Sequence, residues 1–275
     1  MTKQRHILLL GGTAEARELL ETVIKSTEHD VTYSLAGVLG SKAEEVLRSR
    51  MGFDSDHFQF RMGGFGGPKG LHSYMQDHGI DLLIDATHPY ATAISRNAVE
   101  ASKSAGVPLA RFVRHEWAET GEDEWTVVKT LTEAAAALPS GVTAFLSVGR
   151  QSIAPFASRK DCNFVIRSIA EAEEQMFHSA TFIQGMPGRS MEEEMSLFLD
   201  YDIDYLVTKN SGAGKASHKI LAARELHIPV IMIKRPHLPE SPEFSELDPI
   251  LKWINSAPDA PQDGATQSQS QSDPE

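Results

Sequence analysis

Cysteine is nearly absent from this chain. Cys162 is the only one among 275 residues, which excludes an intrachain disulfide framework and any Cys-rich zinc or iron–sulfur site. A chain without disulfides suits a reducing compartment, and we therefore expect a cytoplasmic protein.

Long apolar runs are also missing. The run Ile7–Leu10 is too short for a signal-peptide core or a membrane span, so we expect neither secretion nor a membrane partner. Basic residues are in the minority, because 26 Lys and Arg stand against 38 Asp and Glu and give a formal net charge of −12. Such an acidic surface repels polyanions in bulk, and we expect no nucleic-acid partner.

Metal-binding and hydrolase motifs are lacking too. The 11 histidines include no His-Glu-x-x-His pairing, so no metal site is expected. No Gly-x-Ser-x-Gly turn follows an expected strand, which argues against a serine hydrolase. Residues 256–275 contain no Val, Ile, Leu, Met or aromatic side chain, and we expect this tail to be disordered.

The remaining sequence alternates short aliphatic runs with amphipathic stretches, a pattern typical of βαβ units and parallel sheets. Strands are expected at 6–10, 31–36, 82–84, 107–110, 125–128, 142–147, 164–167, 205–208 and 230–233. Helices are expected at 14–25, 41–48, 68–78, 91–105, 131–138, 151–157, 191–199, 217–224 and 249–254. The polar segment 114–124 interrupts this alternation. We therefore predict two α/β domains with Rossmann-like or flavodoxin-like parallel sheets, residues 1–115 and 125–255, and a cleft between them.

The loops after the strands need most attention, because ligands of open parallel sheets bind at the carboxyl ends of the strands. Gly11, Gly12 and Thr13 follow the first strand and open a helix. Two glycines let the backbone approach a ligand, Thr13 can cap the helix, and the helix N-terminus favours a pyrophosphate. The turn departs from Gly-x-Gly-x-x-Gly, so a plain strand–turn–helix connection remains the alternative.

Three further loops are candidates for function. Residues 209–217 look like a phosphate loop but fail the Walker pattern; their two lysines could hold a carboxylate or phosphate, or could simply be solvated. His88 precedes Pro89 at a strand end and could donate a proton to a ligand or cap a helix. The glycines around Phe65 could form a ligand loop or a mobile turn.

An ordered set of these motifs resembles the precorrin-6A reductase family. The set comprises Gly11-Gly12-Thr13-x-Glu15-x-Arg17, Ser34-Leu35-Ala36-Gly37, Gly63-Gly64-Phe65-Gly66-Gly67, Ile84-Asp85-Ala86-Thr87-His88-Pro89-Tyr90-Ala91, Gly149-Arg150 and Thr208-Lys209-Asn210-Ser211-Gly212. The resemblance implies a two-domain α/β enzyme of cobalamin biosynthesis that uses NADPH to reduce one double bond of precorrin-6A and gives precorrin-6B. Relatives in the anaerobic pathway act on the cobalt-containing substrate.

The resemblance also implies site residues. Cofactor binding is expected at Gly11, Gly12, Thr13, Glu15, Gly37, Thr87, Lys209, Asn210, Ser211 and Gly212. The macrocycle is a polyanion, so an acidic enzyme must concentrate positive charge locally, and substrate binding is expected at Tyr90, Ser147, Gly149, Arg150, Arg167 and Arg189. The proton that accompanies the hydride would come from His88 or from water.

One departure from the family pattern concerns the cofactor. Many relatives carry arginine after Ser-Leu-Ala-Gly, a natural partner for the 2′-phosphate of NADPH, whereas this chain has Val38. NADH therefore stays an alternative to NADPH. Two other functions also remain open: a non-catalytic dinucleotide sensor or scaffold, and a generic NAD(P)-dependent dehydrogenase.

Overall fold

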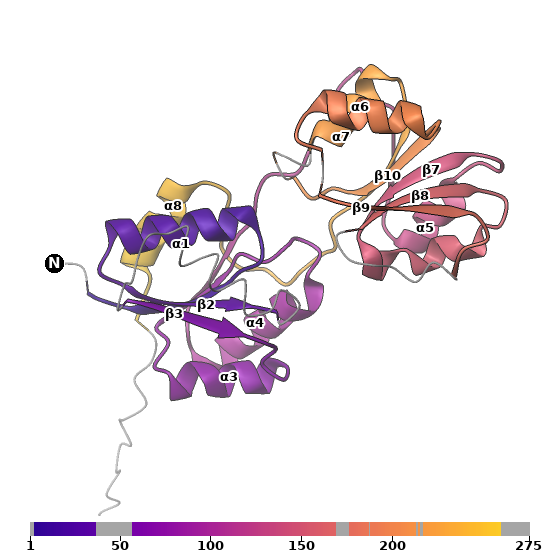
Figure 1. Cartoon of the computed structure of the whole chain (residues 1–275). Helices are drawn as coiled ribbons and strands as arrows, with labels where there is room; N and C mark the ends of the chain where they lie inside the picture. The colour runs from indigo at the N-terminus through magenta and orange to yellow at the C-terminus, as the bar shows by residue number, and fades with distance from the viewer. Residues whose placement is uncertain are drawn as a thin grey trace, which may run out of the picture. The chain divides into compact units, whose positions relative to one another are not determined.

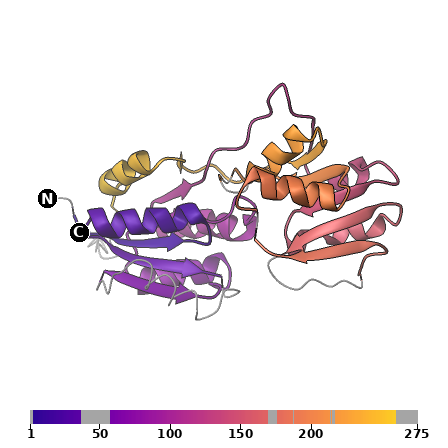
Figure 2. The same ribbon diagram turned by 45° about the horizontal axis from the view of Figure 1, so that its top comes forward.

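The computed structural model describes residues 3–36, 57–168, 176–186, 188–212, 214 and 217–259 (Figure 1). The chain divides into two compact units, Met1–Val113 with Leu238–Glu275, and Arg114–His237. Each unit holds one sheet of six parallel strands, and Figure 2 shows helices packed against both sheets. The predicted pair of α/β domains is therefore confirmed. The cleft predicted between them stays a prediction.

The sheet of the first unit has the strand order of a Rossmann fold. Its strands are β1 (His6–Leu10), β2 (Asp30–Leu35), β3 (Phe58–Met62), β4 (Leu82–Asp85), β5 (Leu109–Phe112) and β12 (Glu243–Phe244). Their spatial order is β12-β5-β4-β1-β2-β3, and every pairing is parallel. The chain therefore adds β2 and β3 on one side of β1, and then β4, β5 and β12 on the other side. Ligands of such sheets bind where the order reverses, at the carboxyl ends of β1 and β4.

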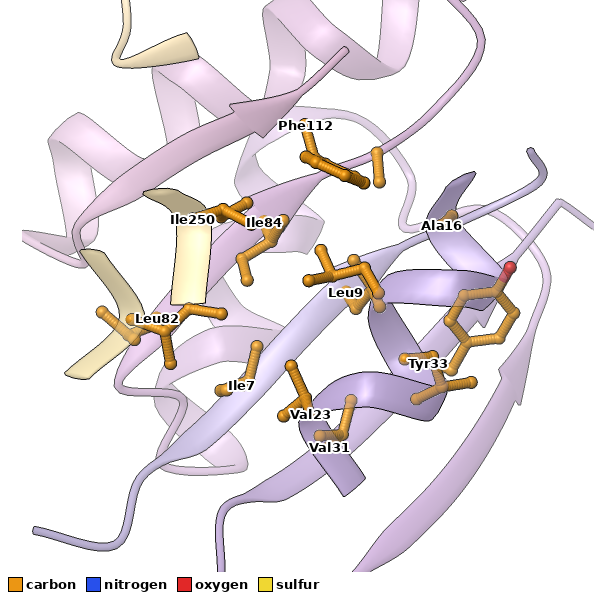
Figure 3. Packing of buried hydrophobic residues seen from close by; sticks show 14 of the residues in the cluster. Ile7, Leu9, Ala16, Val23, Val31, Tyr33, Leu82, Ile84, Phe112 and Ile250 are labelled. Carbon is orange, nitrogen blue, oxygen red and sulfur yellow. The ribbon is translucent and has the colours of Figure 1, made fainter. Parts of the chain in front are cut away.

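Alternating side chains of β1 build two cores, one on each face of the first sheet. Ile7 and Leu9 join the cluster under α1 (Ala14–Ser26) and α8 (Leu247–Ser256), which Figure 3 shows. Leu8 and Leu10 join the cluster under α3 (Pro68–Asp77) and α4 (Thr92–Ala105). All four side chains are at most 2% exposed, as expected for a central strand of a parallel sheet with helices on both faces.

The second sheet has a different strand order, but its order also reverses once. Its strands are β6 (Trp125–Val128), β7 (Thr143–Ser147), β8 (Asn163–Ser168), β9 (Ala180–Gln184), β10 (Tyr205–Lys209) and β11 (Val230–Ile233), in the order β6-β11-β10-β7-β8-β9. All neighbours are parallel. Winding reverses between β7 and β10, so the carboxyl ends of these two strands flank the second switch point.

The helices of the second unit are α5 (Leu131–Ala137), α6 (Met191–Asp200) and α7 (His218–Glu225). Phe145 of β7 and Phe198 of α6 are fully buried in the core under α6 and α7. The helix predicted at 151–157 is wrong, because this stretch forms two 3₁₀ turns, Arg150–Ser152 and Ala154–Ser158. Pro155 lacks the N–H that a continuous α-helix would use there.

Three edge strands escaped the sequence prediction. β3 and β9 lie at the edges of their sheets and are only partly buried, and β12 has only two residues. The helix predicted at 41–48 lies outside the described residues. No helix in the described part of the chain is long and apolar enough to cross a lipid bilayer.

The predicted second domain, 125–255, is wrong at its C-terminal end. The chain returns from Leu238 to the first unit, where β12 pairs with β5 and α8 covers β1 and β4. Ile250 and Ile254 are 0% exposed in this core, and Figure 3 shows Ile250 beside Ile84. An amphipathic helix packs wherever an apolar face is open, and sequence order does not decide which sheet offers one.

The start of the predicted disordered tail is ordered. Ser256 ends α8, Ala257 is 6% exposed in the core, and its carbonyl accepts a hydrogen bond of 2.5 Å from Arg5 Nη2. Lys3 and Asp259 add an ion pair at 3.1 Å. Residues 260–275, the rest of the predicted tail, lie outside the described residues.

The packing of α8 predicts that Ile250→Ala destabilises the first unit by about 2–5 kcal/mol, since it removes buried methyl groups and leaves a cavity. Urea unfolding followed by circular dichroism measures this loss. Lys252→Ala, on the exposed side of the same helix, is the matched control and should change stability by less than about 0.5 kcal/mol. Equal stability of the two variants would contradict the assignment of α8 to this core.

Candidate functional site

The turn after β1 is shaped by Tyr33 from the neighbouring strand β2. A side chain at Gly11 would place its Cβ 2.2 Å from the Tyr33 ring, so only glycine fits there. The N–H of Gly12 donates to the Tyr33 hydroxyl at 3.3 Å, and Gly12 has a φ of +119° with open space where a Cβ would point. Gly11 thus serves packing, whereas Gly12 leaves its backbone accessible to a ligand.

Thr13 fixes the start of α1. Its hydroxyl accepts a hydrogen bond from Ala16 N–H at 3.0 Å as the helix cap, and donates to the Ala86 carbonyl at 3.0 Å. Its only hydrogen-bond donor is therefore used within the fold. The second bond joins the turn after β1 to the loop after β4, so the two loops that flank the first switch point are held together.

The loop after β4 is organised by Asp85, which is 1% exposed. Its Oδ1 accepts from both the N–H and the hydroxyl of Thr87, at 3.1 and 2.6 Å. Its Oδ2 lies 3.5 Å from Nε of Arg111, which also pairs with Glu243. The acid that orients the loop is thus neutralised from β5, and Thr87 is held at the carboxyl edge of the sheet.

His88 is exposed beyond this anchored loop. Its Nδ1 accepts the Tyr90 N–H at 3.3 Å, and the two rings lie 5.8 Å apart. Because Nδ1 is an acceptor in this arrangement, the neutral imidazole carries its proton on Nε2. His88 can therefore present an N–H donor to a bound molecule.

Glu15 lies in the first turn of α1, beside a surface hollow of about 540 Å³. This hollow is lined by Glu15, Glu18, Phe112, Ser245, Glu246, Leu247, Asp248 and Pro249. Four of these residues are acids, so the hollow does not suit a phosphate. Gly37 and Val38 lie outside the described residues.

At the second switch point, the loop after β7 resembles the glycine turn of the first unit. Gly149 has a φ of +84° with open space beside it, and Arg150 is exposed. Ser147 ends β7, and its carbonyl lies 3.5 Å from the Thr208 hydroxyl of β10. Across the switch point, Lys209 Nζ donates to the Ser152 hydroxyl at 2.7 Å, and burial lowers the pKa of Lys209.

The loop after β10 is hydrogen-bonded to residues 114–117, the segment that begins the second unit. The Asn210 amide accepts from Trp117 N–H at 2.8 Å and donates to the Trp117 carbonyl at 2.9 Å. A side chain at Gly212 would place its Cβ 1.8 Å from the His115 carbonyl oxygen. The Ser211 carbonyl accepts from Arg235 Nη2 at 3.2 Å and also from Arg114. These contacts explain Asn210 and Gly212 by local structure.

Arg167 and Arg189, both predicted to bind substrate, differ in surroundings. Arg167 is 9% exposed, and its Nη1 donates to Glu194 at 2.8 Å, so its charge is largely neutralised. Lys219 lies nearby in α7, 5.1 Å from the Trp117 ring centroid, and burial lowers its pKa to about 8. Arg189 is exposed, and its N–H donates to Glu193 at 2.8 Å.

The structure thus gathers the predicted residues at two switch points. The first holds Gly11, Gly12, Thr13, Thr87, His88 and Tyr90, and the second holds Ser147, Gly149, Arg150 and Lys209. Sequence reasoning did not assign a role to Tyr33 or to the Asp85–Arg111 pair. An acid directly after an apolar strand was the available signal for Asp85, but nothing in the sequence points to Tyr33.

Comparisons with known proteins give one consistent answer. Residues 6–255 match the family model described as Precorrin-6x reductase CbiJ/CobK. A Precorrin-6A reductase of Rhodococcus erythropolis is 36% identical over 252 residues, which cover 91% of this chain and 97% of that protein. A Cobalt-precorrin-6A reductase of Priestia megaterium is 29% identical over 258 residues, covering 89% and 96%.

A solved structure, named CobK precorrin-6A reductase, has the same fold across both units. It superimposes with a TM-score of 0.80 at 32% identity, covering 91% of this chain and 96% of that one. The family model also matches nearly the whole folded chain, so the similarity covers the sequence as well as the fold. The chain belongs to the Precorrin-6x reductase CbiJ/CobK family.

Proposed function

We propose that this chain is an oxidoreductase of cobalamin biosynthesis that reduces one carbon–carbon double bond of precorrin-6A to give precorrin-6B. The family match over residues 6–255 carries this proposal. The proposed substrate is the metal-free macrocycle, because the relative named Precorrin-6A reductase is 36% identical and the relative named Cobalt-precorrin-6A reductase only 29%.

The proposed cofactor is NADPH, held by the first unit. A nicotinamide cofactor supplies the hydride for the reduction when it is bound. Three features of the chain suit a dinucleotide: the strand order of the sheet, the open backbone at Gly12, and the N-terminus of α1 with its partial positive charge. Gly11 and Thr13 hold this turn in shape, and Thr87 stands beside it on the adjoining loop. Glu15 lies at the edge of the same turn.

The proposed role of the second unit is to bind the carboxylates of the macrocycle. Arg150 is exposed at the switch point, next to the open backbone of Gly149, and can make charge-assisted bonds. Lys209 offers a second cation, while Asn210, Ser211 and Gly212 keep its loop in place. Ser147 and Arg189 are further proposed contacts of this unit, and Tyr90 is a proposed substrate contact of the first unit. Arg167 is better suited to positioning, since Glu194 already neutralises it.

His88 is the proposed proton donor. Its exposed imidazole would give the proton from Nε2 as the imidazolium, and the neutral ring that remains accepts the Tyr90 N–H at Nδ1. Loss of this group should lower the rate without changing cofactor affinity.

The test is turnover by the purified chain. Oxidation of NADPH should be followed by absorbance with precorrin-6A, with cobalt-precorrin-6A, and with small alcohols or ketones. We expect consumption only with the tetrapyrroles and faster consumption with the metal-free one. Tight NADPH binding without oxidation by either macrocycle would instead support a non-catalytic sensor.

The open backbone at Gly12 predicts that Gly12→Ala weakens NADPH binding at least tenfold, about 1.4 kcal/mol, because the methyl group intrudes where the pyrophosphate approaches. Titration by nicotinamide fluorescence measures the Kd. Gly79→Ala is the control, since Gly79 also has a positive φ and open space beside it but lies after α3. If the two variants bind equally well, the turn does not contact the cofactor.

The exposed charge at Arg150 predicts that Arg150→Ala raises the KM for precorrin-6A at least fivefold, while the Kd for NADPH stays within twofold. Steady-state kinetics and fluorescence titration separate these two quantities. Lys160→Ala removes another exposed charge, which lies before β8 at the opposite edge of the sheet, and should change neither quantity. A change in NADPH affinity alone would reassign Arg150 to the cofactor.

A further inference from the structure

Arg61 occupies the part of the first sheet where a Rossmann fold holds the adenosine ribose. It lies near the carboxyl end of β3, in register with Ser34 near the carboxyl end of β2. Its Nη1 lies 3.4 Å from the Ser34 hydroxyl. Because all strands are parallel, this edge is also the edge of the Gly12 turn.

The guanidinium of Arg61 is held rigidly by its own loop. Nη1 donates to the Gly63 carbonyl at 2.6 Å, and Nη2 donates to the Gly64 carbonyl at 3.0 Å. The group also stacks on Phe65, with its central carbon 3.7 Å from the ring centroid. A planar cation fixed in this way loses little conformational entropy when it binds an anion.

The charge of Arg61 is not neutralised within the described residues. No carboxylate there forms an ion pair with it, in contrast to Arg111 and Arg167, which both have acidic partners. Partial burial lowers the pKa of Arg61, yet an arginine stays protonated at neutral pH. Its three hydrogen bonds leave two of its five N–H donors unpaired in this part of the chain.

The end of β2 is the position that distinguishes the two nicotinamide cofactors. Rossmann folds that use NAD carry an Asp or Glu here, which binds the 2′-hydroxyl and repels a 2′-phosphate, whereas NADP-binding folds place an arginine nearby. In this chain β2 ends with Ser34 and Leu35, followed by Ala36, so no acid stands there.

We propose that Arg61 binds the 2′-phosphate of NADPH, with the Ser34 hydroxyl as a second donor, and that this contact gives the chain its preference for NADPH over NADH. The proposal rests on the proposed function, because it assumes a dinucleotide on the first unit. It places the residue that selects the cofactor on β3, a strand that the glycine motifs of the sequence do not include.

The test compares cofactor affinities of the full-length chain and its Arg61→Gln variant. Glutamine keeps an N–H donor for the loop carbonyls but removes the charge. We expect the Kd for NADPH to rise at least tenfold, and the Kd for NADH to stay within twofold. Competition by adenosine 2′,5′-bisphosphate should weaken in parallel, whereas competition by 5′-AMP should not.

Two further variants keep the result interpretable. Arg61→Lys retains the charge without the planar fork, and its Kd for NADPH should lie between those of the wild-type chain and Arg61→Gln. This variant therefore tests the assignment even if glutamine disturbs the fold. Lys103→Ala removes a charge from the last turn of α4, at the opposite edge of the sheet, and should change neither affinity.

The outcomes separate the two levels of the proposal. Equal losses for NADPH and NADH would mean that Arg61 only supports the loop, and would overturn the assignment, as would unchanged NADPH affinity in a folded variant. A wild-type chain that binds neither cofactor would overturn the proposed function as well. A wild-type chain that turns over precorrin-6A with equal affinity for NADH and NADPH would overturn the cofactor preference alone.

Discussion

The hydrogen bond from the Thr13 hydroxyl to the Ala86 carbonyl, 3.0 Å long, is the contact on which the first site depends. The backbone ladder reaches only the first residue of each loop, where the Ala86 N–H donates to the Leu10 carbonyl at 2.9 Å. The Thr13 hydroxyl adds the side-chain bond that joins the loops of β1 and β4 across the switch point, while the same hydroxyl caps α1. The buried Asp85 performs the same task within the second loop, because it fixes Thr87 and is balanced by Arg111. The polar residues at this edge are therefore preorganised before any ligand arrives.

Charge is handled differently in the core and at the switch points. An unpaired buried charge is costly, so Arg111 and Arg167 each have a carboxylate beside them. Arg61 forms no ion pair with a carboxylate in the described part of the chain, and both Arg61 and Arg150 stand at carboxyl edges of the sheets. A chain with a net charge of −12 repels polyanions overall, so a few cations of this kind must supply its local attraction. Their distribution matters more to binding than the total charge does.

Much of the fold could be predicted from the sequence, because central strands such as β1 and β4 are continuous apolar runs and the helices between them are amphipathic. The return of α8 to the first unit could not, since hydrophobic periodicity shows that a helix has an apolar face but not which sheet it covers. Edge strands such as β3 escaped for a related reason: half-exposed strands resemble loops in composition. The loops were located correctly, yet the sequence could not show that Asn210 bonds to Trp117 of the same unit.

The glycines of the two loops illustrate why a motif alone does not define a site. Gly11 and Gly212 have no room for a Cβ, since a ring or a carbonyl already occupies that space, and their identity is explained by packing. Gly12 and Gly149 face open space at positive φ, so the fold itself needs only their backbone conformation. All four look alike in the sequence. A substitution at the first pair therefore clashes with the fold, whereas a substitution at the second pair strains the backbone and also adds a side chain to the space that a ligand would enter. Only the structure tells the two pairs apart.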